Sequence, residues 1–310
     1  MSWTIPDDGR DFLGYGEHPP LVAWPNGARV AVSLVLNVEE GAERALSSGD
    51  ERNEARYEVE EELVGARDFC MESHFEYGSR AGYWRVMRAF AEVGAVSTLN
   101  LCVRALVRTP WLGRHAVDNG HEIMCHGWRW EHHDAMQEAD ERETIRRCVE
   151  TIRELAGVRP RGWHVKSHPS ANTRRLLMEE GGFLYDSNSY NDDLPVTVRT
   201  GQNPYVVLPY AFDTNDMNFF GTRRFVHGED FSRYCRDAFD CLHEEGASVP
   251  KMMTIGLHTR IIGRPGRIGG LRSFLAHVAE RGGWLARRDE IAEAWLVSGV
   301  PALPAHGKAS

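Results

Sequence analysis

Acidic and histidine residues follow several runs of the sequence that have the composition of buried strands. Residues 29–37 are rich in valine and leucine and lead into Glu39 and Glu40. Three further runs end in the same way, and the residues that follow them are His126, Asp186 and His258. Carboxylates and imidazoles exchange protons in water, so these residues are candidates for an acid–base site if the fold brings the strand ends together.

This combination of groups suits the hydrolysis of a carbon–nitrogen or ester bond. A carboxylate can take a proton from water, and a histidine on the opposite side can protonate the leaving nitrogen. A metal ion or fixed hydrogen-bond donors must then stabilise the tetrahedral oxyanion. One histidine at a strand end is more often structural, so the hypothesis depends on the coincidence of four strand ends.

The elements that would position these residues are seven strand-like runs that alternate with helical patterns. This alternation predicts an α/β protein with a parallel sheet covered by helices. Neither GxGxxG after the first run nor GxxxxGK[ST] nor GxSxG occurs in the chain. A barrel of parallel strands fits best, because its strand C-termini all meet on one rim.

Length and composition exclude several classes of protein. The chain has 310 residues, of which 42% are hydrophobic and 26% charged, as in ordinary globular proteins. Its net charge of −9 differs from the basic balance of a nucleic-acid binder. Since no window approaches 18 uninterrupted apolar residues, we expect no membrane span. We expect one folded unit over residues 1–300, with an N-terminal arm at 1–28 and a flexible tail at 301–310.

The cysteines and the N-terminus predict a cytoplasmic protein. The six cysteines form no CxxC pair, which is typical of free thiols in a reducing compartment. Residues 1–16 contain three aspartates and no apolar core, unlike a signal peptide. Residues 38–62 hold ten acids against three arginines, and we interpret Glu51 to Glu62 as a solvated acidic helix.

Seven segments of the chain carry motifs of a known family. They are GYGEHPP (14–20), WPNGARVAVSLVLNVEEG (24–41), MESHFEYGSRAGYWR (71–85), EIMCHGWRW (122–130), EEGGFLYDSNSYNDDLP (179–195), PYAFDTNDMNF (209–219) and KMMTIGLHTRIIGRPGR (251–267). On these segments the chain resembles the polysaccharide deacetylase superfamily, and more closely its branch of allantoinase-type and cyclic imide hydrolases. The resemblance implies a single distorted (β/α) barrel, here of about seven parallel strands, and a homo-oligomer.

The resemblance also implies roles for the residues that match family motifs. The first motif, an aspartate pair in the family, is Glu39-Glu40 here, which implies Glu39 as general base and Glu40 as metal ligand. The second motif, His-x-x-x-His, begins at His126, which we place in both the catalytic and the metal-binding set. Trp130 stands where the second histidine should be. The last motif, Leu-x-His, implies His258 as general acid.

These departures change the expected chemistry. Glutamate is longer than aspartate by one bond, about 1.5 Å, and tryptophan cannot bind zinc. A catalytic zinc usually has three protein ligands, and Glu40 and His126 supply two. We therefore expect either no metal or a weakly bound divalent metal such as zinc, unless Glu72, His74 or Glu76 completes the site. Trp130 would instead provide an apolar wall suited to a flat heterocycle.

Four further residues are expected to contact the substrate. The third motif lacks the arginine that this branch carries, and Lys166 or His168 is a candidate to replace its charge. A lysine is a point charge and cannot form the paired hydrogen bonds of a guanidinium. One interpretation of the segment after residue 75 places Glu76 and Arg80 in the pocket, whereas the other makes Ser79 the N-cap of a helix. Asp186 is the fourth, from its strand end.

Three functions follow from these residues. The first is an amidohydrolase that opens a small cyclic amide, ureide or imide without a nucleic-acid or membrane partner. The second is a metal-dependent N-deacetylase of acetylated glycan or peptidoglycan fragments, which needs a third metal ligand. The third is a non-catalytic binding protein on the same fold, in which the substituted motifs mark lost chemistry.

Overall fold

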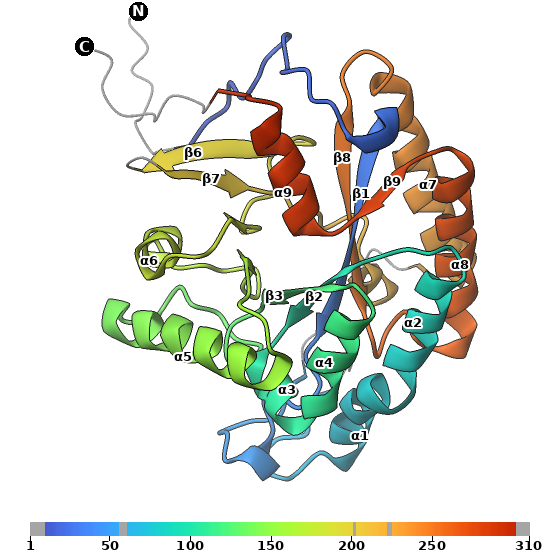
Figure 1. Cartoon of the computed structure of the whole chain (residues 1–310). Coiled ribbons are helices and arrows are strands. Elements are labelled where there is room, and N and C mark those ends of the chain that lie inside the picture. Colours follow the sequence, from blue (N-terminus) through green and yellow to red (C-terminus); the bar gives the residue numbers. More distant parts are fainter. Residues whose placement is uncertain (1–9, 56–60, 201–202, 222–224, 302–310) are drawn as a thin grey trace, which may run out of the picture.

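A curled sheet forms the centre of the molecule, and its longest strand, β1 (Val30–Val38), lies next to one of the two end strands (Figure 1). The computed structural model describes residues 10–55, 61–200, 203–221 and 225–301. Every residue of β1 is buried. Alternate residues of β1 pack into two separate clusters: Val30, Leu34 and Val38 contribute to one, and Ala31 and Val35 to the other. A strand buried on both faces explains the continuous apolar run in the sequence.

The sheet is parallel except for one hairpin. Its order is β6-β7-β5-β4-β3-β2-β1-β8, and β9 also pairs with β1. β2 lies along the C-terminal half of β1, and β9 along the N-terminal half. β6 runs antiparallel to β7. The strands other than β1 are β2 (Thr98–Leu101), β3 (Glu122–Cys125), β4 (Gly162–Trp163), β5 (Tyr185–Asp186), β6 (Val196–Thr200), β7 (Asn203–Val207), β8 (Lys251–His258) and β9 (Trp284–Ala286).

Helices cover the outside of this sheet. They are α1 (Phe69–Tyr77), α2 (Tyr83–Ala91), α3 (Val103–Arg108), α4 (Pro110–Asp118), α5 (Glu138–Ala156), α6 (Thr173–Glu180), α7 (Gly228–Glu245), α8 (Pro265–Glu280) and α9 (Arg288–Val297). The predicted α/β fold, a distorted barrel of parallel strands, is thereby confirmed. In the described part of the chain the two end strands, β6 and β8, do not pair with each other, so the barrel is incomplete.

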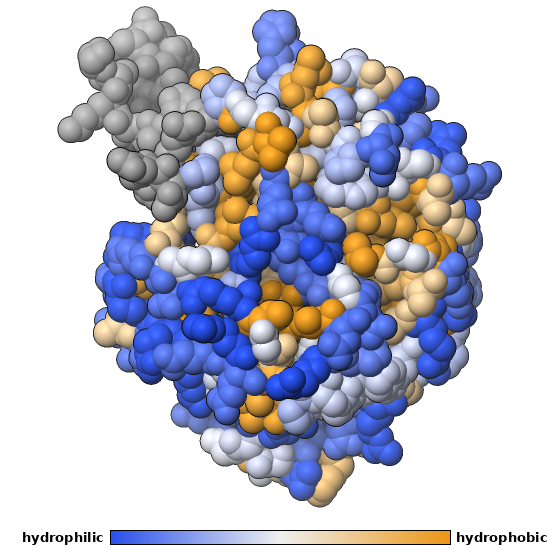
Figure 2. Space-filling model, in the orientation of Figure 1, coloured by the Kyte–Doolittle hydropathy of each residue, from blue (hydrophilic) through white to orange (hydrophobic). Residues whose placement is uncertain are grey.

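α5 illustrates how the sequence determines a covering helix. Its buried side chains, among them Ile145, Cys148 and Ile152, recur every three or four residues. Acidic residues occupy its first turn, and Gly157 ends it with a φ of 79°. The side of α5 visible in Figure 2 is largely hydrophilic. No helix in the described ranges is both long and apolar enough to cross a bilayer.

Some sequence-based expectations were wrong or lie outside the described residues. The sequence patterns did not reveal β6, the antiparallel partner of β7, or β9, a strand of three residues that pairs with β1. Residues 51–55 and 61–62 are not helical, so the acidic helix is absent there, and 56–60 are not described. Ser79 does not begin a helix, because it lies within a π-helical turn (Gly78–Gly82) between α1 and α2. Of the expected arm and tail, 1–9 and 302–310 lie outside the description.

Candidate active site

The sheet brings the ends of β1, β3 and β8 to one rim. The register of β1 against β8 places Asn37 opposite His258, and Glu39 follows two residues later. His126 follows β3, which lies beyond β2 on the other side of β1. Glu39, His126 and His258 are all buried. The fold thus joins residues that are more than 200 positions apart in the sequence.

The two oxygens of Glu39 have different neighbours. Oε2 lies 2.8 Å from Nη1 of Arg260. Oε1 lies 3.4 Å from Nε2 of His126 and 3.5 Å from Nε2 of His258. Burial alone would raise the pKa of Glu39, but Arg260 and the two histidines hold it well below its ordinary value. Glu39 is therefore an ionised carboxylate at neutral pH.

His258 is held between two carboxylates. Its Nδ1 lies 2.6 Å from Oδ1 of Asp216, and its backbone N–H donates to Oδ2 of Asp216 at 2.7 Å. Burial alone would lower the pKa of His258, but the charges of Asp216 and Glu39 raise it to about 10. His258 is therefore an imidazolium at neutral pH, with Nε2–H directed toward Glu39.

His126 has a defined orientation and tautomer. Its Nδ1 lies 2.5 Å from the backbone carbonyl oxygen of His164, which can only accept a hydrogen bond, so Nδ1 carries a proton. In the neutral ring Nε2 is then an acceptor, and it faces Oε1 of Glu39, which is also an acceptor. A molecule with two donor hydrogens can bind both atoms at once.

Glu40 points away from these groups. Its carboxyl accepts a hydrogen bond from the Thr259 hydroxyl and another, at 3.0 Å, from the backbone N–H of Glu39. A Cβ at Gly78 would overlap the Glu40 carboxyl, so only glycine leaves room for it there. Burial raises the pKa of Glu40, and Arg260 and Thr259 oppose that effect only in part.

A pocket of about 440 Å³ opens above Glu39, His126 and His258. Its walls are largely flat side chains, in which Tyr190 stacks on Phe212 with ring centroids 3.9 Å apart. The remaining lining residues are Asn37, Trp130, His132, His164, Lys166, Ser167, Tyr210, Asn215, Met217, Asn218, Phe220 and Gly221. The volume is in the range of sites for small molecules.

Five of the expected site residues line this pocket and four do not. Trp130 and Lys166 join the three residues at its base, and Nζ of Lys166 lies 3.2 Å from the Trp130 ring centroid. Glu40, Glu76 and Arg80 line a separate cavity of about 210 Å³. Asp186 is buried in an ion pair with Arg174, 2.7 Å away. The lining of the pocket gives no support for substrate contacts by Glu76, Arg80 or Asp186.

Sequence reasoning missed several residues of the site. Asp216, Arg260 and the aromatic side chains Tyr190, Tyr210 and Phe212 were not singled out. All five lie in segments that carry the family resemblance, and this was the one feature of the sequence that could have identified them as site residues. Their roles depend on how loops fold over the rim, and strand-end patterns do not contain that information.

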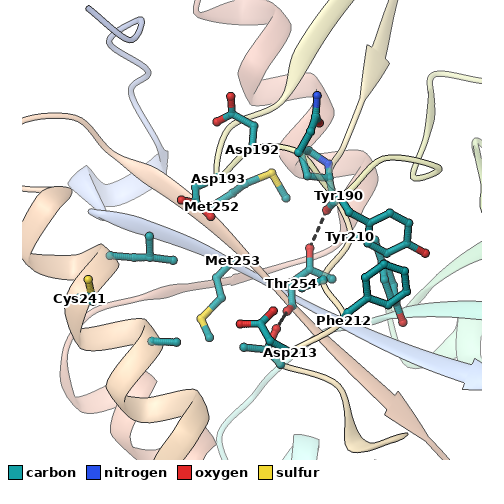
Figure 3. Close-up of a pocket in the computed structure, with 16 residues that line it drawn as sticks. Tyr190, Asp192, Asp193, Tyr210, Phe212, Asp213, Cys241, Met252, Met253 and Thr254 are labelled. Carbon is teal, nitrogen blue, oxygen red and sulfur yellow. Dashed lines mark hydrogen bonds between the residues drawn. The ribbon is translucent and has the colours of Figure 1, made fainter. Parts of the chain in front are cut away.

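A second and larger pocket, of about 550 Å³, adjoins the first (Figure 3). The two pockets share Tyr190, Tyr210 and Phe212 as a common wall. The carboxylates of Asp192 and Asp193 gather here with methionine side chains from β8. None of the converging glutamate and histidine residues lines this second pocket, so the smaller pocket is the better candidate for chemistry.

The residues implied as metal ligands do not fit a resident zinc ion. Trp130 occupies the place of the second imidazole. The guanidinium of Arg260 lies 2.8 Å from Glu39 and 3.8 Å from Glu40, where a cation would have to bind. Among the residues that the structure describes, no three His, Cys, Asp or Glu side chains are grouped so as to hold a metal ion.

Comparisons with known proteins agree with this architecture. The family model for polysaccharide deacetylase matches residues 66–178. A Schizosaccharomyces pombe protein that carries the name polysaccharide deacetylase is 36% identical over 92% of this chain and 96% of its own. This chain belongs to the polysaccharide deacetylase family. The membership expected from the sequence is therefore confirmed.

Two solved structures are similar over almost the whole chain. A probable polysaccharide deacetylase from Pseudomonas aeruginosa is 46% identical, with a TM-score of 0.88 and coverage of 92% of this chain and 97% of its own. The Puue allantoinase is 45% identical, with a TM-score of 0.89 and coverage of 94% and 98%. Relatives of nearly equal similarity thus carry two different names, so the substrate class has to be argued from the pocket.

Proposed function

We propose that this protein is a hydrolase that opens a carbon–nitrogen bond in a small cyclic amide, ureide or imide. The observation that carries this proposal is the juxtaposition of an anionic Glu39 and a cationic His258 at the base of a small, flat-walled pocket. The similarity to an allantoinase over nearly the full chain supports the same class of reaction.

The first step of the proposed reaction is attack by water on the ring carbonyl. A water molecule that donates a hydrogen to Oε1 of Glu39 lies next to Nε2 of His126, which is 3.4 Å from that oxygen. Glu39 takes a proton as the water oxygen bonds to the carbonyl carbon. The imidazolium of His258, at the base of the same pocket, supplies positive charge for the oxyanion that forms.

The second step is cleavage of the carbon–nitrogen bond. His258 donates its Nε2 proton to the ring nitrogen, which leaves as a neutral amine or amide nitrogen. Glu39 then holds the water proton and His258 has lost one. Because Oε1 of Glu39 lies 3.5 Å from Nε2 of His258, a direct transfer restores both groups. The product keeps the water oxygen as a carboxylic acid, which ionises.

The shape of the pocket favours a planar ring over a polymer chain. Its aromatic walls offer flat apolar surfaces, and the stacked pair His164 and Tyr210, with ring centroids 4.4 Å apart, adds to them. Lys166 lies on the same wall as Trp130, and its ammonium group can donate a hydrogen bond to a carbonyl oxygen of the ring. A metal-dependent deacetylase of acetylated glycans is not favoured, because Trp130 replaces the second imidazole, which would be the third metal ligand.

The test is a substrate panel with the purified protein and two variants. Hydantoin, succinimide, dihydrouracil and allantoin should include at least one ring that is opened. Removing either proton-transfer group, in Glu39→Gln or His258→Ala, should lower kcat by about 100-fold or more. Glu92→Gln, an exposed glutamate on another face, is the matched control. Turnover of an acetylated sugar oligomer together with no ring opening would contradict the proposal.

We also propose that the protein works in the cytoplasm and as a homo-oligomer. The six cysteines, four buried and two exposed, are all free thiols in the structure, which supports a reducing compartment. Light scattering on the purified protein tests the oligomer, and a monomer at micromolar concentration would contradict it.

A further inference from the structure

Arg260 is an unusual residue for the interior of a protein. It lies two positions after β8, and its side chain is fully buried. Its Cζ lies 4.2 Å from the ring centroid of Phe75 and 5.5 Å from that of Trp130. Burying a guanidinium is costly, so its position has to be compensated by nearby negative charge.

The compensating groups are the two glutamates of the first motif. Nη1 of Arg260 lies 2.8 Å from Glu39 Oε2 and 3.8 Å from Glu40 Oε1. The ring of Trp130 lies 5.5 Å from Cζ of the same guanidinium. Glu40 and the position of Trp130 are those that the family resemblance assigns to a metal, so the guanidinium lies among the expected ligands.

A divalent cation at these carboxylates would lie within a few ångströms of the guanidinium. At that distance, like charges repel strongly inside a protein, where water does not screen them well. The aromatic faces of Phe75 and Trp130 favour a flat, weakly hydrated cation such as guanidinium. The same faces offer no lone pair to a metal ion.

We propose that Arg260 is a built-in cation that takes the place of the divalent metal in this site. It acts as a positioning residue through Glu39. By binding Oε2, the guanidinium leaves Oε1 directed toward His126 and His258. The part of this inference that concerns metal exclusion stands independently of substrate, whereas the effect on catalysis rests on the proposed function.

Metal exclusion is tested by titrating zinc chloride into two folded variants by calorimetry. Trp130→His supplies the missing imidazole but keeps Arg260. Trp130→His combined with Arg260→Met supplies the imidazole and removes the cation. We expect the double variant to bind one zinc ion at least about tenfold more tightly than the single variant. Equal affinities, including no binding by either, would overturn the proposal, as would tight stoichiometric zinc binding by the wild-type protein.

The positioning role is tested by kinetics, with hydantoin or whichever ring of the panel is opened. Arg260→Met should lower kcat by about 100-fold with little change in KM, because the guanidinium does not line the substrate pocket. Arg260→Lys keeps the charge and should recover part of that loss. Circular dichroism and a thermal melt establish that each variant is folded. If Arg260→Lys and Arg260→Met lose kcat equally while both are folded, the positioning role is wrong. Because zinc binding needs no substrate, failure of the ring-opening proposal remains distinguishable.

Discussion

The charge of His258 is set by Glu39 and by Asp216, a residue that does not line the pocket. Asp216 holds Nδ1 of the imidazole at 2.6 Å and also accepts the backbone N–H groups of His258 and Ile262. This arrangement fixes the ring and keeps its proton. The assignment of His258 as a general acid therefore depends on Asp216 as much as on Glu39.

Asp216→Asn should convert His258 into a weaker proton donor at alkaline pH. Removing one negative charge lowers the pKa of His258 from about 10, so less of the imidazolium is present as the pH rises. We expect the alkaline limb of kcat/KM to move down by about one pH unit or more. Asp213→Asn, an exposed aspartate of the same loop, is the control. An alkaline limb at the wild-type position would contradict this account.

Glu43 makes a separate, pH-dependent contribution to stability. It is nearly fully buried, and burial raises its pKa to about 7. A carboxyl whose pKa is raised by folding favours the native state below the unfolded pKa, and this benefit is lost as pH rises toward the folded pKa. The loss should therefore occur between about pH 4.5 and pH 7.

Glu43→Gln should remove this loss, because a glutamine cannot ionise. Relative to wild type, the free energy of unfolding of the variant should rise by about 2–3 kcal/mol from pH 4.5 to pH 8. Urea unfolding at several pH values measures it. Glu92→Gln provides the same substitution at an exposed site. A difference between Glu43→Gln and wild type that does not change with pH would refute the assignment.

At the scale of elements, the sequence predicts the strands that carry the site residues. It does not predict the π-helical turn that packs against Glu40. The runs before Glu39, His126 and His258 are apolar enough to be recognised as buried strands. The π-helical turn Gly78–Gly82 has no such local signal. It exists because its glycines approach Glu40 and the loop after β8 closely, and such tertiary contacts leave no periodic pattern.

Gly82→Ala should destabilise the protein at this contact. A Cβ at Gly82 would overlap the backbone carbonyl of Thr259, and backbone atoms cannot move aside as a flexible side chain can. We expect a loss of about 1–3 kcal/mol in the free energy of unfolding. Gly269→Ala on α8 is the matched control, since no atom lies within 4 Å of the added methyl group. That variant should gain about 0.5–1 kcal/mol from helix propensity. Equal stability of the two variants would show that the close approach is not a constraint.

At the scale of the whole molecule, the barrel is incomplete, and a buried side chain connects β8 with the region of β5 and β7. That side chain is Arg288, which lies at the start of α9 and is fully buried. Its guanidinium donates to the hydroxyls of Ser187 and Thr254 at 2.9 Å each, and to the carbonyls of Leu208 and Pro209 at 2.7 and 2.9 Å. One side chain thus joins β8 to the segments that follow β5 and β7.

This link is relevant to the active site, because β8 carries His258 while the loop after Leu208 carries the pocket wall and Asp216. No sequence pattern indicates this link, because an arginine at the start of a late helix looks like an ordinary surface residue. Its significance arises only when strands far apart in the sequence are folded around it. The same reason explains why Arg260 was missed.

Arg288→Ala should therefore weaken the whole molecule and not one element. It leaves buried hydroxyl and carbonyl groups without their donor, and we expect a loss of about 3–5 kcal/mol in the free energy of unfolding. The neighbouring Arg287→Ala should cost about 1 kcal/mol or less, because Arg287 forms partly exposed ion pairs with Asp289 and Glu290. Denaturant unfolding followed by both fluorescence and circular dichroism measures the two variants. If Arg288→Ala lowers the free energy of unfolding no more than Arg287→Ala does, Arg288 does not link β8 to the segments after β5 and β7. Apolar packing alone would then hold these parts together.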